Sequence, residues 1–224
     1  MSHPRVSPKA AALLSLLMLT PSAHAQKADG SHEGATHHCA AHKEKARSPD
    51  VVPTTEVRLV DAELLDQDGA RVRFKSEVLA DDIVVMDFVF TTCTTVCPVL
   101  SAVFARVQGQ LGERLGKDVK LVSVSVDPTR DTPARLKTYS SSHRAKAGWR
   151  WLTGSQANVK EVLVGLGAYT PNFVNHAPMV LVGDARTGTW TRLNGFPTEE
   201  QLLAKVNELT TARQRSASAS SERK

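Results

Sequence analysis

The sequence predicts an α/β domain in which a central mixed β-sheet is flanked by helices, with an extra β-hairpin at its N-terminal end. Three observations lead to this fold class. A nearly continuous apolar run covers residues 83–90, apolar residues at helical spacing follow it, and further strand and helix patterns alternate along the rest of the chain. The chain has 224 residues, of which 41% are hydrophobic, so it can form one domain with a sizeable core.

Short strands are expected at the start of the domain. Residues 57–60 and 63–65 are rich in strand-forming side chains, and residues 71–74 form another such run. Between the last two runs stands Asp66-Gln67-Asp68-Gly69, whose residues favour a tight turn. The pattern therefore predicts an opening β-hairpin.

The central strand is expected at residues 83–90, Ile-Val-Val-Met-Asp-Phe-Val-Phe. Its β-branched and apolar character is typical of a strand that is buried on both faces of a partly parallel sheet. A helix should begin beside Cys97, because Pro98 suits a first helical turn, and end at Gly116. Apolar residues recur at helical spacing between these points at Leu100, Val103, Phe104, Val107, Leu111 and Leu115.

The second half of the domain continues the alternation of strands and helices. We expect a strand at 119–126, a helix from Thr132-Pro133 toward His143, a short helix after Ser155, strands at 178–182 and 189–193 around a turn at 184–188, and a last helix opened by the capping box Thr198-x-x-Gln201. This order supports a mixed sheet with helices packed on it.

The first 25 residues have the three zones of a secretory signal in the required order. Positive charge at Arg5 and Lys9 precedes an apolar run at 10–19 and the small-residue triplet Ala23-His24-Ala25. The run is far shorter than the ~20 residues that cross a bilayer as a helix. We therefore expect cleavage after Ala25 and a soluble or loosely membrane-associated periplasmic protein, in an oxidising compartment.

Composition divides the chain into a signal peptide at 1–25, a His-rich flexible linker at 26–53, a folded domain at 54–212 and a disordered basic tail at 213–224. The formal net charge is +5, but residues 51–210 contain as many acidic as basic side chains. Only clustered charge makes a nucleic-acid footprint, so we expect no nucleic acid as a partner.

The most informative residues are Cys93 and Cys97, at the junction between the central strand and the following helix. Backbone N–H groups and the helix dipole stabilise thiolate there, and thiolate is the form that binds metal or attacks a disulfide. The spacing lets both sulfurs chelate one ion or oxidise together, and the alternative is a pair of small buried residues without a reactive role. Thiolates suit Cu(I). His176 is a candidate third ligand, with an ordinary surface histidine as its alternative.

Several segments in the same order resemble the Sco/SenC family over about residues 55–210. They are Phe-Thr-Thr-Cys-Thr-Thr-Val-Cys-Pro at 90–98, Ser-Val-Asp-Pro-Thr-Arg-Asp-Thr-Pro at 125–133 with Leu-Lys-Thr-Tyr at 136–139, Trp-Leu-Thr-Gly at 151–154, and His176 before an apolar strand. The resemblance implies a thioredoxin-like fold with an added hairpin. It also implies a copper site formed by Cys93, Cys97 and His176.

The resemblance further implies a function and partners. Family members are copper chaperones for the dinuclear copper centre of cytochrome c oxidase, and some act as thiol reductants for its cysteines. We therefore expect a metallochaperone rather than an enzyme, carrying copper as Cu(I), with Cu(II) as the alternative. Expected partners are the copper-centre subunit of the oxidase or another periplasmic cuproprotein, and a periplasmic thiol reductant.

Two alternative functions stay open. The first is a thiol-disulfide oxidoreductase in which Cys93 and the more shielded Cys97 exchange electrons with a client. The second follows from Thr94-x-x-Cys97-Pro98, which faintly resembles the peroxidatic segment of peroxiredoxins. Such an enzyme needs a low-pKa cysteine and a nearby arginine, for which Arg130 and Arg150 are the candidates.

Three acidic residues and one linker cluster also have two interpretations each. Asp87 stands inside the buried strand, where similar sequences often carry an uncharged residue, so it either tunes the thiols or is a paired structural residue. Asp127 and Asp131 either have a functional role or shape the scaffold, and their positions beside Pro128 and Thr132 suit turn formation and helix capping. The linker cluster either binds copper or zinc or is a polar segment without a role, and it consists of His37, His38, Cys39 and His42, with His32 nearby.

Overall fold

The computed structural model describes residues 51–53 and 56–221. The expected signal peptide and nearly all of the expected linker, including its His and Cys cluster, lie outside these residues. The described part contains one eight-stranded mixed sheet. Its strands are β1 (Val51–Pro53), β2 (Glu63–Asp66), β3 (Arg71–Arg73), β4 (Ile83–Val89), β5 (Val119–Ser125), β6 (Trp149–Thr153), β7 (Met179–Asp184) and β8 (Thr189–Asn194).

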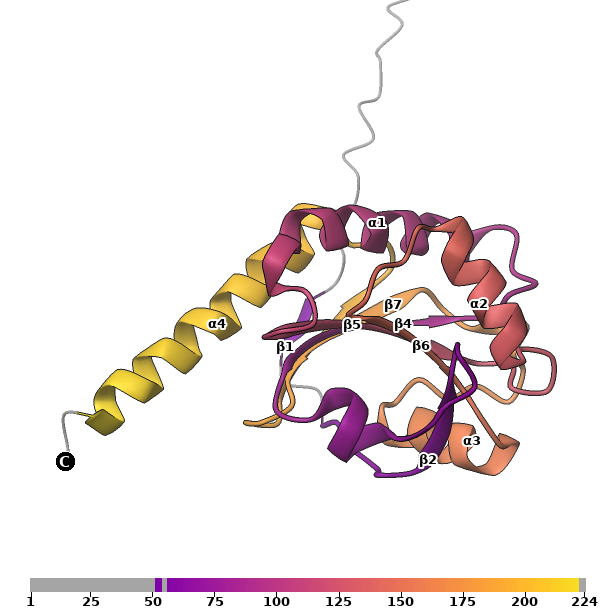
Figure 1. Cartoon of the computed structure of the whole chain (residues 1–224), viewed down its shortest axis with the longest axis horizontal. Helices are drawn as coiled ribbons and strands as arrows, with labels where there is room; N and C mark the ends of the chain where they lie inside the picture. The colour runs from indigo at the N-terminus through magenta and orange to yellow at the C-terminus, as the bar shows by residue number, and fades with distance from the viewer. Residues whose placement is uncertain (1–50, 54–55, 222–224) are drawn as a thin grey trace, which may run out of the picture. The chain divides into compact units, whose positions relative to one another are not determined.

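Helices cover both faces of this sheet (Figure 1). They are α1 (Val96–Leu111), α2 (Pro133–Ser142), α3 (Gln156–Gly165) and α4 (Glu199–Ser221), with a π-helix η1 (Phe74–Leu79) and two 3-10 turns, η2 (Gly112–Arg114) and η3 (Phe173–Asn175). Of the residues that the structure describes, no helix is both long enough and apolar enough to span a membrane.

The strand order β1-β8-β7-β4-β5-β6-β2-β3 places β4 near the middle of the sheet. β4 pairs in parallel with β5 and antiparallel with β7. The hairpin of β2 and β3 joins the sheet through β2, which pairs antiparallel with β6. This arrangement confirms the predicted mixed sheet, the added hairpin and the central place of the apolar strand.

All seven residues of β4 are buried, and successive side chains enter two different apolar clusters. Val84, Met86 and Phe88 pack with α3 and η1 on one face. Val85 and Val89 pack with α1 and α4 on the other face, where both cysteines also lie. Side chains alternate along a strand, so Asp87 points toward the cysteine side of the sheet.

Three details of the expected fold were wrong. Residues 57–60 form no strand, because the N–H of Arg58 bonds to the carbonyl of Gly165 at the end of α3 rather than to a neighbouring strand. A Cβ at Gly165 would lie 2.3 Å from the Arg58 carbonyl oxygen, so this approach requires glycine. The last residues of the expected linker pair with β8 as β1. The strand β6 was not predicted.

The expected disordered tail from residue 213 is also corrected, because α4 continues to Ser221. No glycine or proline interrupts this segment, and the hydroxyl groups of Ser216, Ser218 and Ser220 bond to carbonyls one turn earlier. Arg213 anchors the helix to the sheet through Asp184, with Nε to Oδ2 at 2.6 Å and Nη2 to Oδ1 at 2.7 Å.

Candidate metal centre

Cys93 lies on the turn that connects β4 to α1, and Cys97 is the second residue of α1. The N–H of Cys93 donates to the carbonyl of Phe90 at 3.0 Å, which closes the turn after the strand. Thr95, at the N-cap of α1, supplies no side-chain hydrogen bond to the helix. The sulfur of Cys93 takes this role, since it accepts the N–H of Cys97 at 3.3 Å. Both thiols are free and nearly buried, with exposures of 9% and 4%.

The two thiols have opposite acidities. Burial opposes ionisation of Cys93, but hydrogen bonds from the Cys97 side chain and from the N–H groups at the start of α1 outweigh it, so the Cys93 pKa is lowered. Burial, followed by the adjacent Cys93, strongly raises the pKa of Cys97. Cys93 is therefore the more acidic thiol and the better nucleophile of the pair, and the Cys97 thiol donates a hydrogen bond to its sulfur.

A buried carboxylate holds the thiol turn in place. Asp131 is completely buried, and its Oδ1 accepts the Thr91 backbone N–H at 3.1 Å and the Thr91 hydroxyl at 2.6 Å. Its Oδ2 accepts the hydroxyl of Ser125 at 2.6 Å. Thr91 is two residues before Cys93, so Asp131 fixes the backbone from which that thiol projects.

This contact changes the role expected for Asp131. We expected turn formation and helix capping, but Thr132 caps α2 by accepting the N–H of Arg135. Asp127 does form the expected turn, because its carbonyl accepts the N–H groups of Arg130 and Asp131. The bond from Asp131 to Thr91 joins positions 40 residues apart.

His176 follows the 3-10 turn η3 in the loop that leads into β7. Its ring lies 5.6 Å from the ring of Phe88, and its Nε2 atom is buried without a hydrogen-bond partner among the described residues. Burial lowers the pKa of His176, which favours the neutral imidazole. A neutral imidazole with an unengaged nitrogen is the form that ligates metal.

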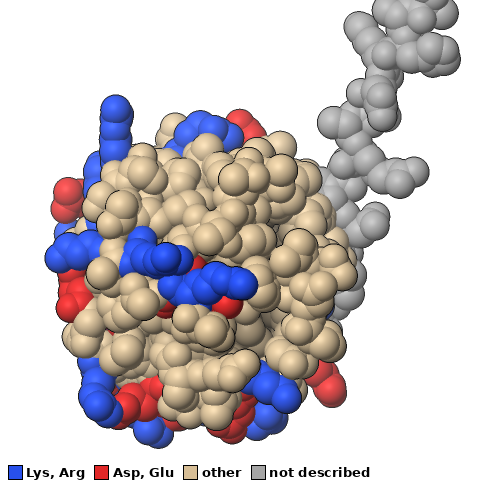
Figure 2. Space-filling model, turned by 90° about the vertical axis from the view of Figure 1, so that its right-hand side faces the viewer, with Lys and Arg blue, Asp and Glu red and all other residues tan. Residues whose placement is uncertain are grey.

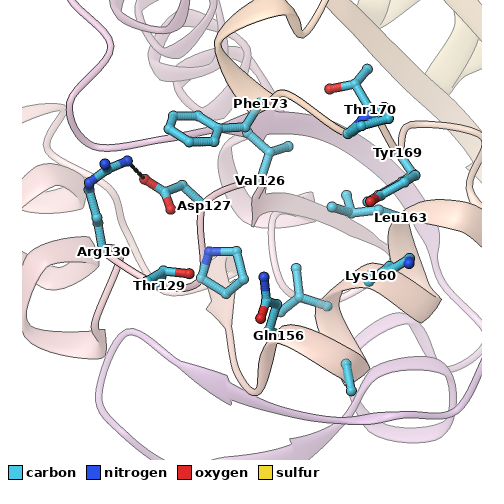
Figure 3. A pocket seen from close by; sticks show the side chains of 14 residues that line it. Val126, Asp127, Thr129, Arg130, Gln156, Lys160, Leu163, Tyr169, Thr170 and Phe173 are labelled. Carbon is cyan, nitrogen blue, oxygen red and sulfur yellow. Dashed lines mark hydrogen bonds and ion pairs between the residues drawn. The ribbon is translucent and has the colours of Figure 1, made fainter.

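The loop between β5 and α2 contacts the thiol turn through Asp131 and the His176 loop through Arg130, which Figure 3 shows beside Phe173. The guanidinium of Arg130 lies 5.4 Å from the centre of the Phe173 ring in η3, and it also forms an ion pair with Asp127 at 3.0 Å. The Phe173 ring also packs edge-on against the ring of Phe90, with the two ring centres 5.2 Å apart. Neighbouring residues of one loop, Arg130 and Asp131, thus support both halves of the candidate site.

Cys93, Cys97 and His176 line one pocket of about 220 Å³. Its other lining residues are Phe88, Phe90, Thr92, Thr94, Thr95, Val96 and Val174. Among the residues that the structure describes, no set of three or more His, Cys, Asp or Glu side chains is arranged closely enough to hold a metal ion. The structure therefore brings the three predicted ligands to one pocket without closing them around a common point.

A larger pocket of about 640 Å³ lies beside this one, between the β5–α2 loop, α3 and the segment before His176 (Figure 3). No cysteine or histidine lines this larger pocket. Phe173, whose ring contacts hold the His176 loop, forms part of its wall.

The peroxidase alternative finds no support at either pocket. Cys97 is buried with a raised pKa, which opposes peroxide attack, and Arg130 is engaged by Asp127.

Asp87 combines both of its expected roles. Its Oδ1 accepts the hydroxyl of Ser123 at 2.5 Å, and that hydroxyl oxygen accepts the indole N–H of Trp149 at 3.0 Å. Its Oδ2 has no partner in the described chain. Burial raises the pKa of Asp87 to about 7, and its negative charge contributes to the raised pKa of Cys97.

The raised pKa of Asp87 makes a pH dependence testable. An unfolded Asp titrates near 3.8 and the folded one near 7, so the folded state binds the extra proton and loses stability as pH rises between these values. Asp87→Asn removes this loss. Urea unfolding should show the variant gaining roughly 4 kcal/mol on the wild type between about pH 4 and pH 8. A stability difference that does not change with pH would contradict the buried neutral acid.

Comparison with known proteins places this site in a family. A sequence model of the SCO1/SenC family matches residues 58–211. The SCO1 protein homolog of Bacillus subtilis (strain 168) is 36% identical over 99 residues, which cover 43% of this chain and 49% of that protein. The chain spans about half the length of the curated relatives it matches.

Two solved structures share the thioredoxin-like fold. BsSco, described as a member of the Sco family of cytochrome c oxidase assembly proteins with a disulfide switch, is 25% identical with a TM-score of 0.56, covering 74% of this chain and 95% of that chain. ScoI of Bradyrhizobium japonicum with copper bound is 29% identical with a TM-score of 0.51, covering 66% and 96%. Because the family match extends over more than half of the sequence, this chain belongs to the SCO1/SenC family.

Proposed function

We propose that this chain is a periplasmic copper-binding assembly factor that holds one Cu(I) ion through Cys93, Cys97 and His176. We further propose that it serves the dinuclear copper centre of cytochrome c oxidase. The observation that carries the proposal is the pocket lined by two thiols and a buried imidazole nitrogen without a partner. The copper-bound structure of ScoI and the oxidase-assembly role named for BsSco support the choice of metal and process.

The donor set suits Cu(I). Two thiolates are soft ligands and an imidazole is a borderline one, which together favour Cu(I) over Mg²⁺ or Ca²⁺. The lowered pKa of Cys93 favours its thiolate form, whereas Cys97 has a raised pKa and must release its proton to bind. We therefore infer that loading releases the proton of Cys97, and that unloading returns it.

Closing the site requires movement of the His176 loop. The thiols belong to a turn fixed by Asp131 and by the start of α1, so they are the rigid half. His176 belongs to a loop whose neighbouring Val174 is 64% exposed and whose main anchors are aromatic contacts. A dithiol on a hydrogen-bonded turn with its third ligand on a separate loop suits a carrier, because loss of that one ligand opens the ion to an acceptor.

Thiol-disulfide exchange is the second candidate function, and the split acidity of the thiols favours it. The Cys93 thiolate would attack a client disulfide, forming a mixed disulfide and releasing one client thiolate. Cys97, after losing its proton, would attack the Cys93 sulfur, forming the Cys93–Cys97 disulfide and releasing the second client thiol. A thiol reductant must then supply two electrons and two protons to restore the pair.

His176→Ala separates the two functions. Removing the imidazole should weaken Cu(I) binding by about 100-fold or more, because a direct ligand is lost and changes outside the ligand set alone cost about 10- to 100-fold, while the reduction potential of the dithiol shifts by less than about 30 mV. Competition with a chromogenic Cu(I) chelator and equilibration with glutathione measure these quantities. His143→Ala is the matched control, since burial also lowers the pKa of His143 but it lies outside the pocket.

Two results of the His176→Ala experiment would contradict His176 as a copper ligand. Unchanged Cu(I) affinity in His176→Ala would contradict the proposed site. Equal loss of copper binding and of disulfide exchange would show that His176 supports the thiols rather than the metal.

A further inference from the structure

No residue that lines the thiol pocket carries a charge. Beside it, Arg130 lies against Phe173 with its charge paired to Asp127, and Arg135 lines a neighbouring pocket together with Thr91 and Thr92. Residues 88–105, which include the thiol turn and the start of α1, contain no Asp, Glu, Lys or Arg. The same holds for residues 166–178, the loop between α3 and β7 that contains His176, and for residues 193–198, from the end of β8 to the start of α4. Outside these three segments, residues 51–210 carry numerous charges of both signs.

The three segments meet at one end of the sheet. Cys93 and His176 line the same pocket, which joins the first two segments. The N–H of Gly195 donates to the carbonyl of Pro178 at 2.8 Å, which joins the third segment to the end of the His176 loop. Figure 2 views the molecule from the side on which β4 ends and α1 begins in Figure 1, and a broad area at the upper right of this view carries no charged side chain.

Exposed apolar side chains lie on these three segments. Val99, in the first turn of α1, is 50% exposed, Val174 beside His176 is 64% exposed, and Phe196 is 49% exposed. Contiguous apolar surface beside a binding pocket is typical of a protein–protein interaction site. Val174 lines the pocket, Val99 follows Cys97 by two residues, and Phe196 is next to Gly195, which bonds to Pro178. We call these three side chains, together with the threonines of the thiol turn, the rim of the pocket.

We propose that this rim is the docking surface for the copper acceptor, and that the matching surface of the acceptor is itself uncharged and apolar. The inference rests on the proposed function, because ligand exchange requires the acceptor's thiols to come within bonding distance of the ion at Cys93. The rim must then be buried in the transfer complex. Burying an unpaired charge against it is costly, so the rim selects a neutral partner and excludes strongly charged ones.

Salt dependence tests the neutrality of the contact. The probe is the reduced, copper-free, soluble copper-centre domain of the oxidase subunit from the same organism, mixed with the copper-loaded chain. Raising the ionic strength from about 0.01 M to about 1 M shortens the Debye length from about 30 Å to about 3 Å. The second-order rate of copper transfer should change by less than about threefold, whereas charge-steered association falls steeply.

Charge insertion tests the location of the contact. Val99→Asp and Phe196→Asp should each slow copper transfer by about tenfold or more, because each buries an unpaired carboxylate in the complex. Val164→Asp is the matched control, since Val164 is 48% exposed but lies on α3, on the other face of the sheet. It should slow transfer by less than about twofold. Circular dichroism and Cu(I) affinity, measured for each variant, establish that folding and loading are intact.

These measurements test the proposed function and the docking surface separately. If the wild-type chain fails to bind Cu(I), the proposed function is wrong. If it binds Cu(I) but Val99→Asp and Phe196→Asp transfer it as fast as Val164→Asp does, the docking surface is wrong. Copper binding without any transfer to the probe, or transfer that slows steeply with salt, would also overturn the inferred match to a neutral acceptor.

Discussion

Replacing Cys93 or Cys97 with serine is expected to abolish stoichiometric Cu(I) binding by this chain. Serine supplies a hard hydroxyl oxygen in place of a soft thiolate and does not ionise at neutral pH. Changes to groups outside the ligand set alone cost about 10- to 100-fold in metal affinity, so losing a sulfur ligand should cost more than about a hundredfold. Competition titration against a chromogenic Cu(I) chelator measures the loss.

The two cysteine variants should differ in their second readout. In a chain that also carries Cys39→Ser, Cys93→Ser removes the more acidic thiol, so the remaining buried Cys97 should react slowly with iodoacetamide. Cys97→Ser keeps the Cys93 sulfur that accepts the Cys97 backbone N–H, so alkylation should stay fast. Cys39→Ser is the control and should leave one-to-one binding intact. Cu(I) binding that survives loss of both Cys93 and Cys97 would falsify the proposed site.

Replacing Asp131 with asparagine is expected to damage both the fold and the thiol turn. The carboxylate accepts three hydrogen bonds, two from Thr91 and one from Ser125. Asparagine offers one acceptor oxygen and an NH₂ group that can only donate, so at least one buried donor loses its partner. The free energy of unfolding should fall by about 3 kcal/mol.

The functional consequence of Asp131→Asn follows from the position of Thr91. A looser turn moves Cys93 away from the N–H groups of α1, so its pKa should rise and its alkylation at neutral pH should slow. Urea unfolding and the pH profile of iodoacetamide alkylation measure the two effects. Asp118→Asn is the control, since this residue is half-exposed and pairs with Arg114 at the surface. If Asp131→Asn matched this control in both measurements, Asp131 would have no role in holding the turn.

Local patterns in the sequence were enough to predict the rigid half of the site. The apolar run of β4 and the helical spacing of α1 are each determined within about twenty residues, and the junction between them contains both cysteines. The order of strand, thiol, turn, thiol and helix therefore predicted the environment that lowers the pKa of Cys93. The same reasoning located the buried acid Asp87, although it could not choose between its two roles.

The other half of the site depends on contacts that no local pattern encodes. His176 reaches the thiol pocket only because β7 is the antiparallel neighbour of β4, and resemblance rather than periodicity suggested it as a ligand. The bond between Asp131 and Thr91 and the stacking of Arg130 on Phe173 each join loops about forty residues apart. The strand β6 was missed for a similar reason. Its alternation at Trp149 and Trp151 is short, and its pairing with β5 decides its structure.

The central claim is that one copper ion is held by two sulfurs and one imidazole. Its most direct test is a Cu(I) titration of the reduced full chain, with X-ray absorption to count the ligands. The chain should carry Cys39→Ser, His37→Ala, His38→Ala and His42→Ala, so that the linker supplies no donors. The account predicts one ion per chain with two sulfur neighbours from Cys93 and Cys97 and one nitrogen neighbour from His176. A site with fewer than two sulfurs, or with no nitrogen, would contradict it.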